Sequence, residues 1–280
     1  MPAWAKAALV LGVLTGLGAP AYAQLTDLVS RTSFRVCADP ANAPMSVKDG
    51  SGFENRIAEL FSQKLERPLE YFWFPMAQGF VRRTLSENRC DVIIGFAQGD
   101  DLVLNSNAYY TSTHVLVTRT DSDLADVKTL ADPRLKGRRI GVIAGSPAAS
   151  HLANNDLLAT TEGYHLMVDR RIESPNQQML IDLIAGKLDM AVMWGPIGGP
   201  LAKQSSERLT VTPLIGEPGS PRLFYRISMG VRNGEDVWKR ELNSTIRALQ
   251  PEIDAILRDA GVPLLNDMGT ALKPEPEPAP

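Results

Sequence analysis

Residues 34–61 read FRVCADPANAPMSVKDGSGFENRIAELF and decide the fold class of this chain. The short apolar run at Phe34–Ala38 is typical of a buried strand, and residues 39–51 form a polar loop rich in turn-forming residues. Ser51 and Glu54 have the spacing of a capping box, which predicts a helix that begins here. The apolar residues that follow at helical spacing are Phe53, Ile57, Leu60 and Phe61.

The same order of elements returns later in the chain. Residues 139–144 are predicted to form a strand, Gly145 a turn, and Ser146-Pro147 the start of a helix, because Ser is a favoured N-cap and Pro a favoured first helical residue. In an open α/β sheet the loops at the carboxyl ends of the strands line the ligand crevice. The repeated pattern therefore predicts two α/β lobes that face each other with these loops turned inward.

The two lobes are expected to be interleaved in the sequence. Residues 24–118 and 225–271 are predicted to form lobe I, and residues 119–224 lobe II, because the last helices should pack on the first lobe. The chain would then cross between the lobes twice, which lets one lobe rotate as a rigid body. Residues 272–280 are a Pro/Glu tail that is expected to be disordered.

Three local features complete this prediction. Residues 195–200 are rich in Gly and Pro and are expected to form a loop at the carboxyl end of a strand. Apolar residues at helical spacing predict one helix over 238–249 and a second over 251–260. The second helix is expected to end at Gly261.

Composition and charge limit the class of protein. The 280 residues are 44% hydrophobic and 22% charged, as in ordinary globular domains, and the formal net charge is −3. The sequence has no basic run and no stripe of aromatic and basic residues. Binding of nucleic acid is therefore not expected.

Residues 1–23 have the features of a secretory signal peptide. Lys6 supplies a positive charge, residues 7–19 an apolar segment, and Ala21-Tyr22-Ala23 a cleavage site of small residues. Cleavage after Ala23 predicts an exported protein. A membrane anchor is the alternative, but the apolar stretch is short for a span, and no other stretch is expected to cross a membrane.

Cys37 on the first strand and Cys90 just before residues 91–96 are the two cysteines. In an oxidising compartment such a pair is a disulfide candidate. Two buried free thiols are the alternative, because parallel neighbouring strands could hold the Cα atoms more than roughly 7 Å apart. The sequence has no CxxC, zinc-site, GxSxG, HExxH or P-loop motif, so no metal, cofactor or catalytic residue is predicted.

A series of segments in a fixed order spans nearly all of the chain after residue 23. They are FRVCAD, GFENRIAELF, RCDVIIGF, NAYYTSTHVLV, LKGRRIGVIAGS, QQMLIDLIAGKLDMAV and ISMGVRNGEDVWKREL. With these segments the chain resembles the type II periplasmic solute-binding proteins, the receptors of ABC importers. The resemblance implies two α/β lobes, two hinge crossings and a ligand cleft that closes on binding.

Several segments look more closely like one branch, which is associated with pyrroloquinoline-quinone (PQQ) methanol dehydrogenases. These segments are FRVCADP, GFENRIAEL, YFWFP, GFVRRTL, RCDVIIGF and AVMWGP. The resemblance implies a periplasmic, non-catalytic accessory protein whose partner is a PQQ-dependent methanol dehydrogenase, with its cytochrome c as a further candidate. The protein is expected to be a monomer. An importer receptor for a small molecule other than a standard amino acid, and a dehydratase-like enzyme, are the alternatives.

The sequence departs from the amino-acid-binding members of that family at two positions. Those members place an Arg after the strand that corresponds to residues 92–96, where it clamps the ligand carboxylate. They also place an Asp for the amino group after the strand that corresponds to residues 190–194. Here residues 97–101 contain no Arg, and Trp194-Gly195-Pro196 contains no Asp. An amino-acid ligand is therefore not expected.

Loops at the carboxyl ends of the first-lobe strands supply candidate cleft residues. Asp39, Asn42 and Met45 follow the first strand, although Asp39 and Asn42 could instead only cap the turn. Phe96 and Gln98 end the strand at residues 92–96 and begin the loop after it. These five residues are predicted to line the ligand cleft.

The second lobe supplies three further candidates. Ser146 could hold an anion at a helix N-terminus, where the helix dipole favours negative charge, or could be a plain N-cap. His151 lies on the same helix and is expected in the cleft wall or at the surface. Trp194, which precedes the Gly-Pro pair, is the aromatic candidate for the cleft.

Overall fold

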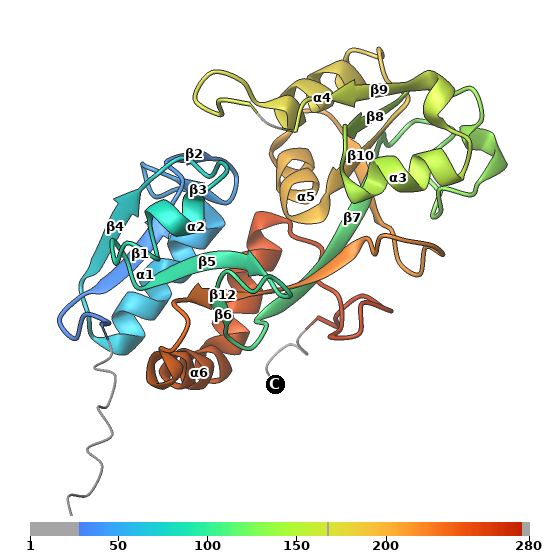
Figure 1. Cartoon of the computed structure of the whole chain (residues 1–280). Helices are drawn as coiled ribbons and strands as arrows, with labels where there is room; N and C mark the ends of the chain where they lie inside the picture. The colour runs from blue at the N-terminus through green and yellow to red at the C-terminus, as the bar shows by residue number, and fades with distance from the viewer. Residues whose placement is uncertain (1–27, 167, 276–280) are drawn as a thin grey trace, which may run out of the picture.

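The structure is a computed structural model that describes residues 28–166 and 168–275. It has two α/β lobes: lobe I contains the first part of the chain and the long last helix, and lobe II contains the middle part (Figure 1). The predicted two-lobed fold is therefore confirmed. The predicted signal peptide, residues 1–23, lies outside the described residues.

A mixed sheet forms the centre of lobe I. Its strands are β1 (Phe34–Ala38), β4 (Leu69–Trp73), β5 (Val92–Ala97) and β12 (Phe224–Val231), with the short β2 (Ala41–Asn42), β3 (Ser46–Val47) and β6 (Leu104–Asn105). β1 lies parallel between β4 and β5, and β12 pairs antiparallel with β5. The carboxyl ends of β1 and β5 therefore lie at one edge of the sheet, from which their loops extend.

Helices cover both faces of this sheet. α1 (Phe53–Leu65) and α6 (Asp236–Ala260) pack on one face, where Ile57 and Leu242 are fully buried in the larger core cluster. The short α2 (Phe80–Arg83) covers the other face together with Ile93. Side chains alternate across a strand, so β1 and β5 contribute to both clusters.

Lobe II is a second α/β unit with a parallel core. Its strands are β8 (Ile140–Ile143), β9 (Thr161–Tyr164), β10 (Met190–Trp194) and β11 (Leu209–Pro213). β8 lies parallel between β10 and β9. Its helices are α3 (Pro147–Asn154), which packs in one core cluster, and α4 (Pro175–Ile184) and α5 (Gly195–Gln204), which pack in another.

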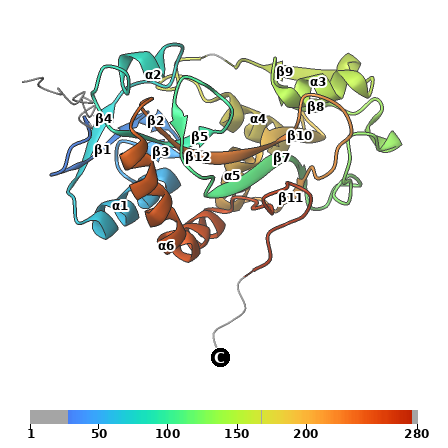
Figure 2. The same cartoon turned by 60° about the horizontal axis from the view of Figure 1, so that its bottom comes forward.

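The strand β7 (Tyr110–Arg119) joins the sheets of the two lobes. Residues 110–113 pair with β12, whereas residues from His114 onward pair with β10 and β11. Figure 2 shows β7 and β12 between the lobes. The predicted lobe boundaries, at 118/119 and 224/225, stay predictions; the second lies within the N-terminal end of β12.

Two predictions of local structure were wrong. Residues 195–200 do not form a loop but begin α5, because Pro196 suits the first turn of a helix. A Cβ atom at Gly199 would lie 2.1 Å from the backbone oxygen of Gly261, so glycine permits the close approach of α5 to the end of α6. The two predicted last helices are one, since the buried face continues past Pro251.

The structure contains the disulfide between Cys37 and Cys90, one of the two alternatives that the sequence left open. The Cα atoms are 5.5 Å apart because β1 and β5 are neighbours. Next to it, the buried Asp91 carboxylate accepts hydrogen bonds from Arg35 and Arg232. This disulfide and ion-pair cluster fixes the end of β5 that is farthest from the loops.

The C-terminal segment begins in contact with lobe I. Of the tail predicted over residues 272–280, residues 272–275 are described, and Lys273 forms an ion pair of 2.5 Å with Asp254. Residues 276–280 lie outside the described part of the chain. No described helix is long and apolar enough to span a membrane.

Candidate functional site

A cavity of about 380 Å³ lies between the two lobes. Lobe I contributes Asn42, Met45, Glu54, Met76, Gly95, Ala97, Tyr225 and Ile227 to its lining. Lobe II and β7 contribute His114, Ile143, Ser146, Pro147, His165, Leu166, Val168, Arg170, Pro175, Asn176, Val192, Trp194 and Ile197. The lining is largely apolar with a few polar groups, as is typical of small-molecule sites.

Glu54 is the acidic group in this lining. It lies in the first turn of α1, and its side chain is buried, with the residue 7% exposed. Burial raises the pKa of Glu54 to about 8, and the nearby Arg170 acts in the opposite direction. The carboxyl group therefore faces the cavity in surroundings that favour its neutral form until a positive charge arrives.

The predicted capping box at Ser51 and Glu54 was wrong. The N-cap of α1 is Gly52, without a side-chain hydrogen bond, and Glu54 faces the cavity. Sequence reasoning assigned Glu54 to helix capping and missed it as a site residue. The signal that could have found it is its place directly after the loop that follows β1, at the edge where ligand crevices form.

Gly95 on β5 makes room for the Glu54 carboxyl group. A Cβ atom at Gly95 would lie 1.9 Å from Glu54 Oε1, and Gly95 has a positive φ of 79°. Both conditions exclude an ordinary side chain here. The strand thus leaves a recess in the cavity wall that the carboxyl group fills.

Arg170, in the loop between β9 and α4, reaches from lobe II to the β1 loop of lobe I. Its Nη1 donates a hydrogen bond of 2.7 Å to Asn42 Oδ1 and lies 3.5 Å from Asp39 Oδ2. The Asp39 side chain also accepts hydrogen bonds from the backbone amides of Ala41 and Met76. The charge of Arg170 is therefore balanced by Asp39.

Three rings form an aromatic wall in the cavity. The His114 and Trp194 rings are 5.4 Å apart, and the Trp194 and Tyr225 rings are 5.6 Å apart, both pairs in edge-to-face arrangement. His114 Nδ1 donates a hydrogen bond to the Leu223 carbonyl, and burial lowers the pKa of His114. The imidazole is therefore neutral at pH 7.

The structure brings four of the eight predicted cleft residues to the cavity: Asn42, Met45, Ser146 and Trp194. Ser146 is also the N-cap of α3, because its side chain accepts a hydrogen bond from the amide of Ala149. Their role toward a ligand stays a prediction.

The other four predicted residues are not in the cavity lining. Asp39 lies behind it and holds Arg170, as described above. Gln98 donates a hydrogen bond to the Ser106 carbonyl, and the buried His151 donates one to the Pro221 carbonyl. Phe96 lines a second hollow instead.

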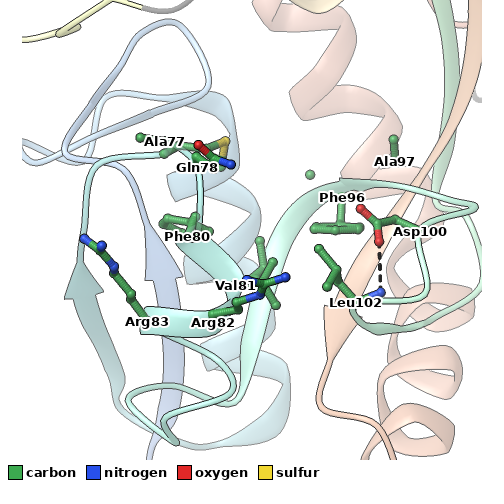
Figure 3. A pocket seen from close by; sticks show the side chains of 14 residues that line it. Ala77, Gln78, Phe80, Val81, Arg82, Arg83, Phe96, Ala97, Asp100 and Leu102 are labelled. Carbon is green, nitrogen blue, oxygen red and sulfur yellow. Dashed lines mark hydrogen bonds between the residues drawn. The ribbon is translucent and has the colours of Figure 1, made fainter.

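That second hollow, of about 750 Å³, lies on lobe I beside the cavity (Figure 3). The two share Met76, Gly95 and Ala97 in their linings. Phe80, Phe96 and Leu102 give the hollow an apolar floor, and its edge carries Arg82, Arg83 and Asp100. Within the described residues neither arginine forms an ion pair. We call this site the rim hollow.

The cavity can bind a small molecule but has few groups for catalysis. Its titratable side chains are Glu54, His114, His165, Arg170 and Tyr225. In the part of the chain that the structure describes, no group of three or more His, Cys, Asp or Glu side chains could hold a metal ion. The arrangement suits recognition of one charged group by Glu54 next to an apolar body.

Comparisons with known proteins give a consistent result. The chain is 34% identical over 281 residues to protein MoxJ of Methylorubrum extorquens, which covers 91% of this chain and 92% of that protein. It is 26% identical to protein MoxJ of Paracoccus denitrificans, and this match covers 89% of this chain and 96% of that protein. The solved structure of the periplasmic binding protein XoxJ of Methylobacterium extorquens is 42% identical in sequence, with a TM-score of 0.72. The match covers 84% of this chain and 100% of that chain. No protein-family model matches the chain.

Proposed function

Because this chain belongs to the MoxJ family of periplasmic binding proteins, we propose that it is a non-catalytic accessory protein of a PQQ-dependent methanol dehydrogenase. The observation that carries the proposal is the similarity over nearly the full length of both MoxJ and XoxJ. It supports the resemblance to the dehydrogenase-associated branch that the sequence segments indicated. In this proposal the protein is secreted with cleavage after Ala23, acts as a monomer, and assists activation or assembly of the dehydrogenase.

The cleft supports a role other than amino-acid uptake. No Arg follows β5 to clamp a carboxylate, and Arg170 is engaged by Asn42 and Asp39. Trp194 begins the aromatic wall where amino-acid-binding members of the fold have an Asp. A receptor for amino acids would need both anchors, so the cleft does not suit that ligand class.

We place the contact with the dehydrogenase at the rim hollow. Its apolar lining is exposed at Met76 and Leu102, which are 36% and 48% exposed. The charges of Arg82 and Arg83 at its edge, which are in no ion pair with another described residue, fit a partner surface with acidic groups around an apolar side chain. An accessory protein has to release its client, so a modest contact below about 1,200 Å² is expected.

The proposed surface does not include residues 195–200, which the sequence predicted to form a Gly/Pro loop. These residues begin α5, and most of them are buried. The hairpin of β2 and β3 reaches the cavity with Asn42 and Met45, and the loop after β5 reaches the rim hollow with Asp100 and Leu102. These two segments and α2 are the candidate contact elements.

A deletion strain tests the accessory role. We expect methanol-dependent dehydrogenase activity in periplasmic extracts to fall when this gene is deleted and to return when the gene is supplied on a plasmid. The amount of dehydrogenase polypeptide and its bound PQQ should be measured in the same extracts, because they separate failed assembly from failed activation. Unchanged activity, PQQ content and polypeptide amount in the deletion strain would refute the proposal.

An importer receptor for a small molecule is the second candidate, because the structure has a cavity between its lobes. In that case deletion would abolish uptake of one solute and leave the dehydrogenase unchanged. Binding of purified dehydrogenase to the purified protein would distinguish the two candidates further, since only the accessory role requires it.

A further inference from the structure

We propose that the cavity between the lobes binds a protonated organic amine without a carboxylate, whose ammonium group pairs with Glu54. This inference goes beyond the accessory role and does not depend on the dehydrogenase, because it concerns the isolated protein. The ligand would have an apolar body that fits a cavity of about 380 Å³.

The first support is that the Glu54 carboxyl group has no partner among the described residues. Within residues 28–166 and 168–275, no group forms a hydrogen bond or an ion pair with it, although the residue is only 7% exposed. Buried carboxyl groups are normally satisfied by hydrogen bonds or ion pairs. The recess at Gly95 holds this one at the cavity wall. A ligand group that donates hydrogen bonds would satisfy the Glu54 carboxyl group.

The second support is the balance of charge around the cavity. Asp39 and Arg170 neutralise each other, and Arg170 also donates to Asn42. When Glu54 is ionised, these three groups leave one negative charge. A ligand with one positive charge balances it, whereas a carboxylate on the ligand would be repelled by the ionised Glu54 carboxylate.

The third support is the aromatic wall of His114, Trp194 and Tyr225. Aromatic faces attract cations, and Trp does so most strongly among side chains. Aliphatic side chains complete the surroundings, among them Met45, Ile143 and Val192. One carboxyl group with aromatic rings and aliphatic side chains suits an ammonium group on an apolar body. Among the described residues, no three His, Cys, Asp or Glu side chains are grouped so that they could hold a metal ion here.

Amine binding should release protons. Without a cation beside it, the Glu54 carboxyl group is largely protonated at pH 7, because burial raises its pKa to about 8. An ammonium group nearby favours the ionised form. Each amine that binds should therefore drive a proton into solution. Neighbouring groups do not supply this proton: burial raises the pKa values of Tyr109 and Tyr110 well above 10, and burial lowers the pKa of His114, so its ring is already neutral.

The test is calorimetric titration of the protein purified from the periplasm with three probes of similar shape. These are benzylammonium chloride, benzyl alcohol and sodium benzoate. We expect benzylammonium to bind about tenfold or more tightly than benzyl alcohol, and benzoate not to bind. Titrations at pH 7 in phosphate and in MOPS buffer measure the proton release, because these buffers differ in heat of ionisation and neither is a simple ammonium ion that would compete for the site.

Three variants locate the binding. Glu54→Gln should weaken benzylammonium binding about tenfold or more and abolish proton release, while its affinity for benzyl alcohol stays unchanged. Trp194→Leu should weaken benzylammonium binding by removal of the cation–π contact. Glu59→Gln is the matched control, since Glu59 is an exposed acid on the same helix.

The proposal is overturned by any of three results. The first is that none of three amines, benzylammonium and the further probes butylammonium and 1,4-diaminobutane, binds at millimolar concentration. The second is that benzyl alcohol binds as tightly as benzylammonium. The third is that the Glu54→Gln variant binds benzylammonium as tightly as the Glu59→Gln variant does. If Glu54→Gln does not fold, proton release by the unaltered protein and the Trp194→Leu affinity decide.

Discussion

The Arg170 guanidinium of lobe II donates a hydrogen bond of 2.7 Å to Asn42 Oδ1 of lobe I. The same nitrogen lies 3.5 Å from the buried carboxylate of Asp39. The contact therefore joins the lobes at the cavity, on the side of the loops, whereas β7 and β12 join them through the sheet. The Arg170 side chain is 37% exposed, so solvent screening limits its contribution to about 1 kcal/mol.

We predict that Arg170→Ala opens the cleft. A loss of about 1 kcal/mol changes the ratio of closed to open molecules about fivefold. The lobes should then rotate about β7 and the start of β12, which raises the radius of gyration in small-angle X-ray scattering.

Arg171→Ala is the control for this prediction, because Arg171 pairs with Asp169 in its own loop and does not reach lobe I. Both variants remove one positive charge from the same loop. Identical scattering curves for the two variants would show that Arg170 does not hold the lobes together.

We predict that Glu54 makes the protein less stable as pH rises. In the folded chain its pKa is about 8, against an ordinary value of 4.5. Between these values the folded state keeps a proton that the unfolded state has lost, so the stabilising contribution is complete below about pH 4.5 and is lost by about pH 8. From pH 5.5 to pH 8 the contribution of Glu54 to the free energy of unfolding should fall by about 3 kcal/mol.

Urea unfolding of Glu54→Gln at both pH values measures this contribution. Between these pH values the free energy of unfolding of Glu54→Gln should fall by about 3 kcal/mol less than that of the unaltered protein. Glu59→Gln should behave like the unaltered protein. His114 faces the same cavity, but both chains contain it, so its titration cancels in the comparison. An unchanged pH dependence in Glu54→Gln would contradict the burial argument.

The fold could be predicted from the sequence because each signal was local. An apolar run at residues 34–38, a polar loop and an amphipathic helix suffice to indicate a strand, a crevice loop and a covering helix. The ordered segments of the known family then fixed the two-lobed arrangement. Where local signals conflicted with tertiary packing, as in α5 with its glycines and prolines, the prediction was wrong.

The site could be predicted only in part because it depends on contacts between distant residues. Asn42, Met45, Ser146 and Trp194 were found from their places after strands. Glu54 was missed because its spacing from Ser51 has a second, commoner explanation as a cap. Arg170 was missed because nothing local connects its loop to Asn42, which lies 128 residues earlier in the chain.

We predict that removal of the disulfide between Cys37 and Cys90 lowers stability without change of fold. The bond closes a loop with a sequence separation of 53 residues. Because it restricts the entropy of the unfolded chain, a bond over a loop of this length should raise the free energy of unfolding by about 4 kcal/mol. The double variant Cys37→Ala/Cys90→Ala should show this loss in urea unfolding. A reductant should destabilise the unaltered protein and leave the variant unchanged; equal sensitivity of both chains would exclude the bond.

The last prediction concerns the rim hollow and rests on the proposed accessory role. Arg82 and Arg83 lie at the edge of its apolar floor, and neither is in an ion pair within the described residues. If they meet acidic groups of the dehydrogenase, Arg82→Glu/Arg83→Glu should weaken association about tenfold or more at low salt. Salt screens such charges, so association of the unaltered protein should weaken from 50 to about 500 mM salt.

Arg240→Glu/Arg247→Glu is the matched control, because both residues are exposed on α6, which covers the opposite face of the lobe I sheet. This control pair changes the net charge of the protein by the same amount as Arg82→Glu/Arg83→Glu does. Binding of each protein to immobilised dehydrogenase from the same cell should be measured across the salt series. If the contact is at the rim hollow, the control pair keeps the affinity and the salt dependence of the unaltered protein, whereas the rim pair loses both. Equal losses in the two pairs would mean that net charge alone governs association, and the contact would have to be placed elsewhere.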